Sequence, residues 1–370
     1  MKYYIIAGEA SGDLHGSNLI KALREKDSKA EIRCWGGDLM QDAGGTLVKH
    51  YKEMAFMGFL EVIVNLGTVL RNIKFCKHDI ANFNPDVLIF IDFSGFNLRI
   101  AEWAKQQKIK TNYYISPQIW ASREGRINKI KRDIDTMLVI LPFEKKFYEK
   151  KHGFPVHFVG HPLIDAIGNR NSLDETSFRK ANHLDNGKRI IALLPGSRKQ
   201  EVRKMLQTML SVIDDFPEFN FVIAGAPSLD REFYHPFLSK PNVGFVANKT
   251  YDLLNISHAA LVTSGTATLE TALFKIPQVV CYKANWLSYQ IAKRIITLDY
   301  ISLVNLIMDK EVVKELIQNN LNTKNLKQEL AKIIDGPARK SQLDAYNLLE
   351  EKLGGIGASE KAATLIVENA

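Results

Sequence analysis

The residues best placed to do chemistry lie in the segment 260–270, ALVTSGTATLE, where an apolar strand leads through a turn of small residues into a helix. Ser264, Gly265 and Thr266 leave backbone N–H groups uncovered at the helix start, which is a favourable position for phosphate. Glu270 follows one turn later, where its carboxylate can accept hydrogen bonds from sugar hydroxyls. The pattern indicates a nucleotide-sugar pocket. A strand–turn–helix with simple Ser/Thr capping is the alternative.

A second turn of this kind follows the apolar strand Ile190–Leu194. Gly196 permits a tight turn, and Ser197 can cap the next helix. Arg198 places a permanent positive charge at a helix start, where the helix dipole disfavours it unless an anion is bound. We therefore expect both turns and Arg198 to bind the diphosphate of a nucleotide, with a plain surface arginine as the alternative. No acidic cluster with Mg²⁺ spacing accompanies these turns, so we predict transfer without a metal or cofactor.

The first half of the chain carries acidic loops instead. Glu9 lies in the glycine-rich loop after the first strand, whose glycines are spaced too widely for a dinucleotide motif. Asp92 directly follows the apolar strand Val87–Ile91, where partial desolvation would raise its pKa towards that of a general base. We expect Asp92 to be the base and Glu9 to bind the acceptor, with Glu9 as second and His161 as third choice for the base. A helix-capping role for Asp92 and a hinge role for His161 are the alternatives.

Two stretches suit a membrane surface. In a helix expected over residues 59–75 the polar positions form one narrow stripe, which leaves a wide apolar face. Residues 123–132 carry five basic side chains and a single acidic one, Glu124. Both could contact anionic phospholipid. A core helix and a solvated helix face are the respective alternatives.

Length and composition limit the class of protein. The 370 residues suit two domains, and 46% hydrophobic with 24% charged residues is typical of a globular protein. No run is long enough to span a membrane, and three cysteines without disulfide or metal spacing predict a cytoplasmic location. The net charge of +8 favours anionic partners. We expect no nucleic-acid partner, because no nucleic-acid-binding motif is present.

Apolar runs of strand length alternate with helical patterns, which predicts parallel sheets with crossover helices. We predict an α/β fold of two Rossmann-like domains that face a cleft. The domains comprise residues 1–168 and 169–345, and a helical tail follows at 346–370. The boundary lies in the polar stretch Asp165–Gly187, and the chain is expected to be mostly helical after Glu311. The expected strands are Tyr3–Ala7, Ile32–Trp35, Val87–Ile91, Lys110–Ile115, Thr136–Leu141, Val156–Val159, Ile190–Leu194, Asn220–Ala224, Val243–Val246, Ala259–Thr263 and Gln278–Cys281.

Several longer motifs carry a family resemblance. The chain resembles the lipid-A-disaccharide synthases in the stretches AGEASGD, MGFLEV, IDFSGFN, YISPQIWA, LPFEKKFY, FVGHPL, LLPGSR, SGTATLE and DYISLVNL, which follow the family's order as far as about residue 318. The resemblance implies the glycosyltransferase-B architecture and an inverting transfer. It also adds Asn305, in DYISLVNL, to the residues expected to bind the nucleotide.

The resemblance implies a specific reaction. UDP-2,3-diacylglucosamine would donate its sugar to the 6-hydroxyl of 2,3-diacylglucosamine 1-phosphate, giving the β-1,6-linked lipid A disaccharide 1-phosphate and UDP. The acylated substrates imply peripheral association with the inner membrane of a Gram-negative type of bacterium. A homo-oligomer is compatible with the sequence, which does not determine it.

Two other functions remain open on the sequence alone. Another UDP-sugar enzyme of the same fold, such as a UDP-N-acetylglucosamine 2-epimerase, would share the phosphate turns but needs no wide apolar helix. A non-catalytic module that binds nucleotide sugars or lipids would need no reactive Asp92.

Overall fold

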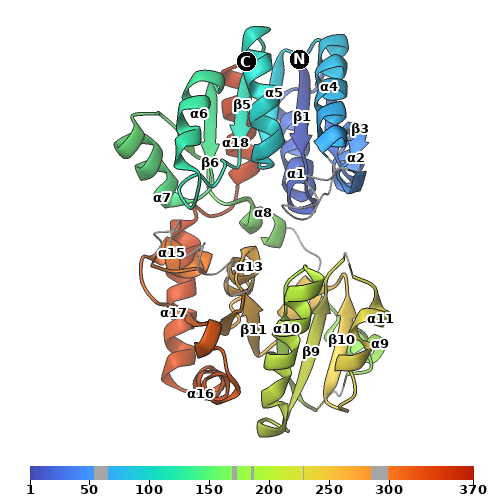
Figure 1. Cartoon of the computed structure of the whole chain (residues 1–370), viewed down its shortest axis with the longest axis vertical. Helices are drawn as coiled ribbons and strands as arrows, with labels where there is room; N and C mark the ends of the chain where they lie inside the picture. The colour runs from blue at the N-terminus through green and yellow to red at the C-terminus, as the bar shows by residue number, and fades with distance from the viewer. Residues whose placement is uncertain (54–65, 169–172, 185–186, 228, 285–298) are drawn as a thin grey trace. The chain divides into compact units, whose positions relative to one another are not determined.

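The computed structural model describes residues 1–53, 66–168, 173–184, 187–227, 229–284 and 299–370. The chain forms two compact domains, of which the first comprises residues 1–169 and 353–370 and the second residues 170–352. The expected tail at 346–370 is therefore divided. Its first part continues a helix of the second domain up to Lys352, and the rest returns to the first domain, where both termini lie (Figure 1).

The first domain is built on a seven-stranded parallel sheet of order β3-β2-β1-β4-β5-β6-β7. The inner strands are continuous apolar runs, as expected for strands covered on both faces. The order reverses between β1 and β4, which places a topological switch point there. The strands are β1 (Lys2–Ala7), β2 (Glu31–Gly36), β3 (Thr46–His50), β4 (Val87–Ile91), β5 (Lys110–Tyr114), β6 (Thr136–Val139) and β7 (His157–Phe158).

Helices cover both faces of this sheet (Figure 1). Alternate strand residues such as Leu88 and Phe90 belong to one core with α4, α5 and α6. On the other side α1 packs against α8 and the C-terminal helix α18. The helices are α1 (Ala10–Lys26), α2 (Asp38–Asp42), α4 (Leu66–Phe83), α5 (Ser94–Gln106), α6 (Ile127–Asp133), α7 (Pro142–Lys145), α8 (Pro162–Gly168) and α18 (Ala358–Glu368).

The second domain repeats this architecture with a six-stranded parallel sheet of order β10-β9-β8-β11-β12-β13. Its order reverses between β8 and β11, which is the second switch point. The strands are β8 (Arg189–Leu194), β9 (Phe219–Gly225), β10 (Val243–Ala247), β11 (Ala259–Thr263), β12 (Gln278–Tyr282) and β13 (Lys314–Ile317).

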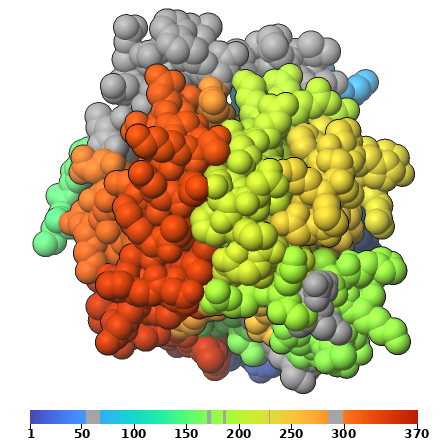
Figure 2. All heavy atoms as spheres, turned by 90° about the horizontal axis from the view of Figure 1, so that it is seen from below, coloured from blue at the N-terminus to red at the C-terminus, as the bar shows by residue number. Residues whose placement is uncertain are grey.

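Two apolar cores lie on opposite faces of the second sheet. One joins the strands to α10 and α16, and the other joins them to α9 and α12. Figure 2 shows α16 and α17, in orange-red, beside the yellow-green α10 on one surface of this domain. The helices are α9 (Glu175–Ala181), α10 (Lys199–Met209), α11 (Arg231–Tyr234), α12 (Thr250–Asn255), α13 (Thr266–Leu273), α15 (Leu303–Met308), α16 (Thr323–Ile334) and α17 (Pro337–Lys352).

The two-domain α/β prediction is confirmed, but two edge strands were missed. Strands β3 and β13 were not predicted, and β13 interrupts the region expected to be mostly helical. Both are short, carry charged residues and lie at the edge of a sheet, so the continuous apolar signal of a central strand is missing. Asn305, expected to bind the nucleotide, lies in α15, whose first turn is capped by Ser302.

Candidate active site

The first switch point brings the acidic loops together. Ala7 at the end of β1 pairs with Ile91 at the end of β4, so the loops carrying Glu9 and Asp92 leave the same edge of the sheet side by side. In open α/β sheets this edge is where ligands bind. The expectation that both carboxylates lie at a functional edge therefore agrees with the topology.

The backbone at Asp92 is strained. Asp92 and Phe93 both adopt left-handed conformations, with φ of 43° and 46°. Such conformations cost energy in non-glycine residues and persist only where the surroundings impose them. Here the Asp92 carbonyl accepts hydrogen bonds from the Tyr113 hydroxyl at 2.5 Å and the Asn97 amide at 2.8 Å. Neither partner was singled out from the sequence, because only the strand pairing brings Tyr113 near.

Packing explains a glycine in the neighbouring loop. A Cβ at Gly8 would lie 2.3 Å from the ring of Phe93. Gly8 therefore serves the contact between the Glu9 and Asp92 loops rather than the approach of a ligand. Helix α1 begins at Ala10, directly after this loop, with Glu9 as its N-cap residue.

Electrostatics prepare Asp92 to accept a proton. Burial, followed by the negative charge of Glu9, raises the pKa of Asp92 to about 6. A carboxylate with this pKa is ionised near neutral pH and is a stronger base than an exposed one. Asp92 does not cap α5, whose N-cap residue is Phe93.

A pocket of about 340 Å³ opens beside Asp92. Its remaining wall comes from the start of α5, from the loop after β5, and from the turn that precedes α6. The lining residues are Asp92, Ser94, Pro117, Gln118, Ile119, Ser122, Arg123 and Arg126. The basic stretch 123–132 does not form one continuous surface. Arg123 and Arg126 line the pocket, whereas Lys129 and Arg132 form ion pairs with Glu102 at 3.9 Å and 2.8 Å.

Two other polar residues of the first domain are structural. His161 is buried, and its Nδ1 accepts a hydrogen bond from the Leu163 amide at 3.2 Å. Burial and the neighbouring His15 lower the pKa of His161 to about 3, which leaves a weak base. The carboxylate of Asp13, in the first turn of α1, accepts hydrogen bonds from the Gly37 and Met40 amides at 2.7 Å and 3.0 Å.

The second switch point brings the two small-residue turns together. Leu194 of β8 pairs with Val262 of β11, so the turns 195–198 and 263–266 leave the sheet as neighbours. Gly196 and Gly265 adopt φ of 96° and 143°, which side-chain-bearing residues rarely do. A Cβ at Gly265 would meet no heavy atom of the described chain within 4 Å, so the approach to this turn is open.

A cation and an unpaired hydroxyl accompany these turns. The Arg198 side chain is 72% exposed and its Nη1 lies 3.1 Å from Oε1 of Glu201. The hydroxyl of Thr263 is buried between the turns and has no hydrogen-bond partner among the described residues. Buried polar groups are normally paired, which suggests that a ligand or water completes this one. Thr263 was not singled out from the sequence, because it reads as the last residue of the strand.

Glu270 is positioned by a residue from another helix. Its Oε1 accepts a hydrogen bond of 2.7 Å from the hydroxyl of Tyr251 in α12. Burial raises the pKa of Glu270, and the Tyr251 bond opposes that shift. No sequence pattern links the two residues, since they are 19 positions apart on different helices.

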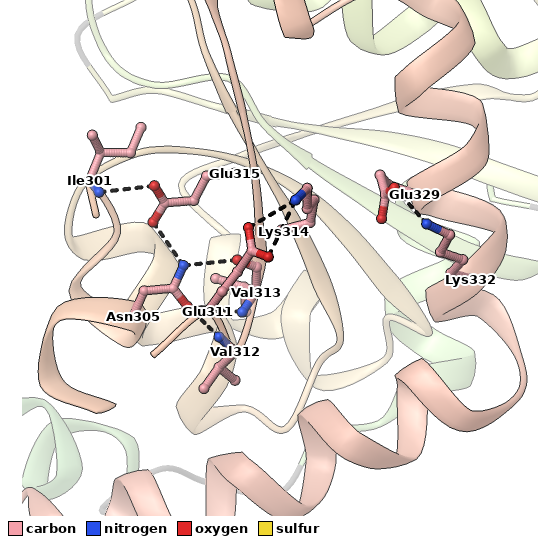
Figure 3. Close-up of polar contacts among 9 residues, drawn as sticks. All are labelled: Ile301, Asn305, Glu311, Val312, Val313, Lys314, Glu315, Glu329 and Lys332. Carbon is pink, nitrogen blue, oxygen red and sulfur yellow. Dashed lines mark hydrogen bonds and ion pairs between the residues drawn. The ribbon is translucent and has the colours of Figure 1, made fainter. Parts of the chain in front are cut away.

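Asn305 has no hydrogen-bonding position left for a nucleotide (Figure 3). Its amide donates to the Val313 carbonyl and to Glu315, each at 2.9 Å, and accepts from the Val312 and Val313 amides at 2.8 Å and 2.9 Å. Both donors and both acceptor positions are used. We therefore leave Asn305 out of the nucleotide contacts.

Asn305 instead supports the turn at Ser264 through a chain of hydrogen bonds. Its partner Glu315 also accepts from the Ile301 amide at 3.0 Å (Figure 3). The Ile301 carbonyl in turn accepts from the hydroxyl of Ser264 at 2.8 Å. The segment around Asn305 thus fixes the Ser264 turn, whose backbone amides are the groups expected to meet phosphate.

The helix expected over residues 59–75 lies partly outside the described residues, and its described part is α4. Val69 packs against the core, whereas Leu70 and Phe75 are 55% and 47% exposed. Among the helices that the structure describes, none combines the length and apolarity that a membrane span requires.

Known proteins resemble the chain closely. The family model for lipid-A-disaccharide synthetase matches residues 3–367. The lipid-A-disaccharide synthase of Geobacter metallireducens is 38% identical over 98% of this chain and 96% of its own length. Those of Syntrophus aciditrophicus and Coxiella burnetii are 39% and 36% identical over the same shares.

Solved structures share the fold at low sequence identity. The UDP-GlcNAc 2-epimerase of Neisseria meningitidis, bound to UDP-GlcNAc, matches with a TM-score of 0.68 at 15% identity over 100% of this chain and 99% of its own. The glycotransferase of kitacinnamycin matches with a TM-score of 0.66 at 13% identity over 100% and 98%. These neighbours are consistent with a glycosyltransferase-B fold. The agreement in sequence over nearly the full length goes further, and on that basis the chain belongs to the lipid-A-disaccharide synthase family.

Proposed function

We propose that this chain joins UDP-2,3-diacylglucosamine to 2,3-diacylglucosamine 1-phosphate, forming the β-1,6-linked lipid A disaccharide 1-phosphate and releasing UDP. Family membership over residues 3–367 is the observation that carries this proposal. It makes the protein a hexosyltransferase that acts on a UDP-sugar and a lipid. The two switch points supply the groups such a transfer needs.

In the proposed reaction, Asp92 removes the proton from the acceptor 6-hydroxyl. The oxygen attacks the anomeric carbon of the donor from the face opposite UDP, so that the new C–O bond forms as the bond to the diphosphate breaks. One displacement inverts the anomeric centre, and no covalent sugar–enzyme intermediate is needed. Glu9 raises the pKa of Asp92 and lies in the adjacent loop, where it can accept a hydrogen bond from the acceptor.

The proposed donor site is the second switch point. The turns at Gly196–Arg198 and Ser264–Thr266 face the diphosphate with backbone amides, and Arg198 stabilises the charge that develops on UDP as it leaves. Glu270 accepts hydrogen bonds from the ribose hydroxyls. Asn305 acts only through the turn that it supports.

The epimerase alternative rests on fold similarity at 15% identity and is less well supported than the family's own reaction. Incubation with the two acylated substrates tests both, with products identified by mass spectrometry. We expect the disaccharide 1-phosphate and UDP, with activity retained in excess chelator. Conversion of UDP-N-acetylglucosamine to its 2-epimer without disaccharide would favour the alternative, and UDP binding without any product would favour a non-catalytic module.

We also propose peripheral association with the inner membrane through residues 59–75 and the outward-facing part of the stretch 123–132. The exposed Leu70 and the half-exposed Phe75 of α4 support this, because apolar side chains at the surface can enter the lipid interface, although the ring of Phe75 also contacts Trp35. Replacing Leu70 with Ser should reduce sedimentation with anionic vesicles and leave thermal unfolding little changed, because this side chain is 55% exposed. Loss of the thermal transition with unchanged sedimentation would instead assign this face to the core.

A further inference from the structure

The pocket beside Asp92 contains more positive charge than its one carboxylate explains. Arg126 lies at the start of α6, and its Nη1 donates to the hydroxyl of Ser94 at 2.8 Å. Arg123 lines the same pocket from the preceding turn. Among the described residues, no carboxylate lies within ion-pair distance of either guanidinium. Two cations thus line one hollow with a single carboxylate, Asp92, and neither forms an ion pair with a described residue.

The excess of positive charge in the pocket affects the pKa of Arg126. Burial, followed by the charges of Arg123 and Arg99 among other groups, holds the pKa of Arg126 below its ordinary value. Neighbouring like charges repel each other, so the free pocket stores an unfavourable interaction that a bound anion would relieve. Guanidinium groups are suited to phosphate because their planar N–H groups match two of its oxygens at once.

The arginines are held by a rigid wall. The carboxylate of the buried Glu144 accepts hydrogen bonds from the Ser116 hydroxyl at 2.5 Å and from the Trp120 indole at 3.2 Å. The Tyr148 hydroxyl donates to the Pro117 carbonyl at 3.2 Å. Arg123 itself adopts a left-handed conformation, with φ of 59°. The loop that presents Arg123 and Arg126 is therefore fixed in place, as a binding site requires.

From these observations we infer that Arg123 and Arg126 bind the phosphomonoester of the acceptor and so direct its 6-hydroxyl towards Asp92. The inference rests on the proposed function and adds the recognition of one end of the acceptor. The 1-phosphate and the 6-hydroxyl project from either side of the ring oxygen of one sugar. A pocket that holds the phosphate at one wall and Asp92 at another thus sets the orientation of the sugar between them.

The test compares two acceptors, 2,3-diacylglucosamine 1-phosphate and the same lipid without phosphate, both in detergent micelles. Arg126→Gln should lower kcat/KM for the phosphorylated acceptor by about 10- to 100-fold, the range for a charged hydrogen bond. It should change kcat/KM for the dephosphorylated acceptor by less than about twofold, because no partner is lost. Arg123→Gln should act in the same direction, and Arg126→Lys, which keeps the charge, should lose less.

Lys110→Gln is the matched control, because it removes one cation from the opposite end of β5 and should leave both acceptors unaffected. Equal losses on both acceptors would overturn the inference, as would wild-type protein that does not distinguish them. Calorimetric binding of the two lipids separates this inference from the proposed function. Phosphate-dependent binding that requires Arg126, without turnover, would refute only the reaction, whereas turnover with phosphate-independent binding would refute only the phosphate site.

A bilayer phosphate is the competing source of the same chemistry. Sedimentation with phosphatidylglycerol vesicles should be equal for wild-type protein and Arg126→Gln. If sedimentation falls as far as activity does, and activity recovers in detergent, Arg126 binds membrane lipid and the inference is wrong.

Discussion

The two switch points occupy equivalent places in the two sheets and differ in the loops they carry. At the first, Asp92 and Phe93 are non-glycine residues in left-handed conformations, held by hydrogen bonds from Tyr113 and Asn97. At the second, Gly196 and Gly265 take the positive φ values, and a Cβ at Gly265 would meet no heavy atom of the described chain within 4 Å. A parallel sheet brings two loops together at its reversal point, and loop composition then decides what that point can do.

The difference has a physical consequence. A strained, supported loop fixes one carboxylate in a defined position, which suits a group that must meet a proton at hydrogen-bond distance. A glycine turn at a helix start offers several N–H groups and little bulk, which suits a large anion. We therefore expect variants of the first switch point to change chemistry and variants of the second to change the binding and release of UDP.

Asp92→Asn should produce the largest effect, a fall in kcat of roughly 10²–10⁴-fold. Asparagine preserves the size of the side chain and tolerates the left-handed backbone, but it cannot accept the proton. Steady-state assays measure the loss, and calorimetric UDP binding should stay unchanged. Near-normal turnover of Asp92→Asn together with inactive Glu9→Gln would show that Glu9 is the base.

Arg198→Ala should reduce kcat by on the order of 10²-fold, because the charge on the departing diphosphate loses one preorganised partner. The neighbouring Lys199→Ala serves as the control, since the Lys199 ammonium lies over the ring of Phe233. Single-turnover measurements should place the defect in the transfer step. An equal loss in both variants would indicate a general charge effect rather than a contact with the leaving group.

Glu270→Gln should weaken UDP binding by roughly 1–3 kcal/mol, as expected when a charged hydrogen bond is lost. Isothermal titration calorimetry measures this directly. Tyr251→Phe, which removes the 2.7 Å hydrogen bond to Glu270 but keeps the carboxylate, should weaken binding less. Unchanged affinity in Glu270→Gln would refute the ribose role.

The pH dependence should be the smallest effect and should follow the first switch point. Because the pKa of Asp92 is raised to about 6, its basic form is lost as pH falls through that value. The kcat/KM for the acceptor should decline about tenfold per pH unit below it. A profile flat down to pH 4.5 would mean that Asp92 does not act as the base.

Much of the fold was predictable because it depends on local patterns. Continuous apolar runs such as Val87–Ile91 identified the central strands, since both faces of a parallel sheet are buried. Small residues after a strand located the two turns at the second switch point, and their binding of phosphate stays a prediction. The edge strands β3 and β13 lacked that signal, and the C-terminal helix could not be assigned to a domain because its partner, α1, lies at the other end of the chain.

The sequence by itself determined the α/β class, the family and the set of loops that could carry chemistry, because strand periodicity, turn residues and long motifs are local properties of the chain. Only the tertiary structure decided which of those residues have polar groups left to contact a substrate. The fold places the charge of Glu9 near Asp92 on neighbouring loops, and it lets Arg126 donate a hydrogen bond to Ser94. It also uses the side-chain amide of Asn305 in hydrogen bonds to Val313 and Glu315. Availability depends on burial and on hydrogen-bond partners distant in sequence, which residue spacing along the chain does not encode.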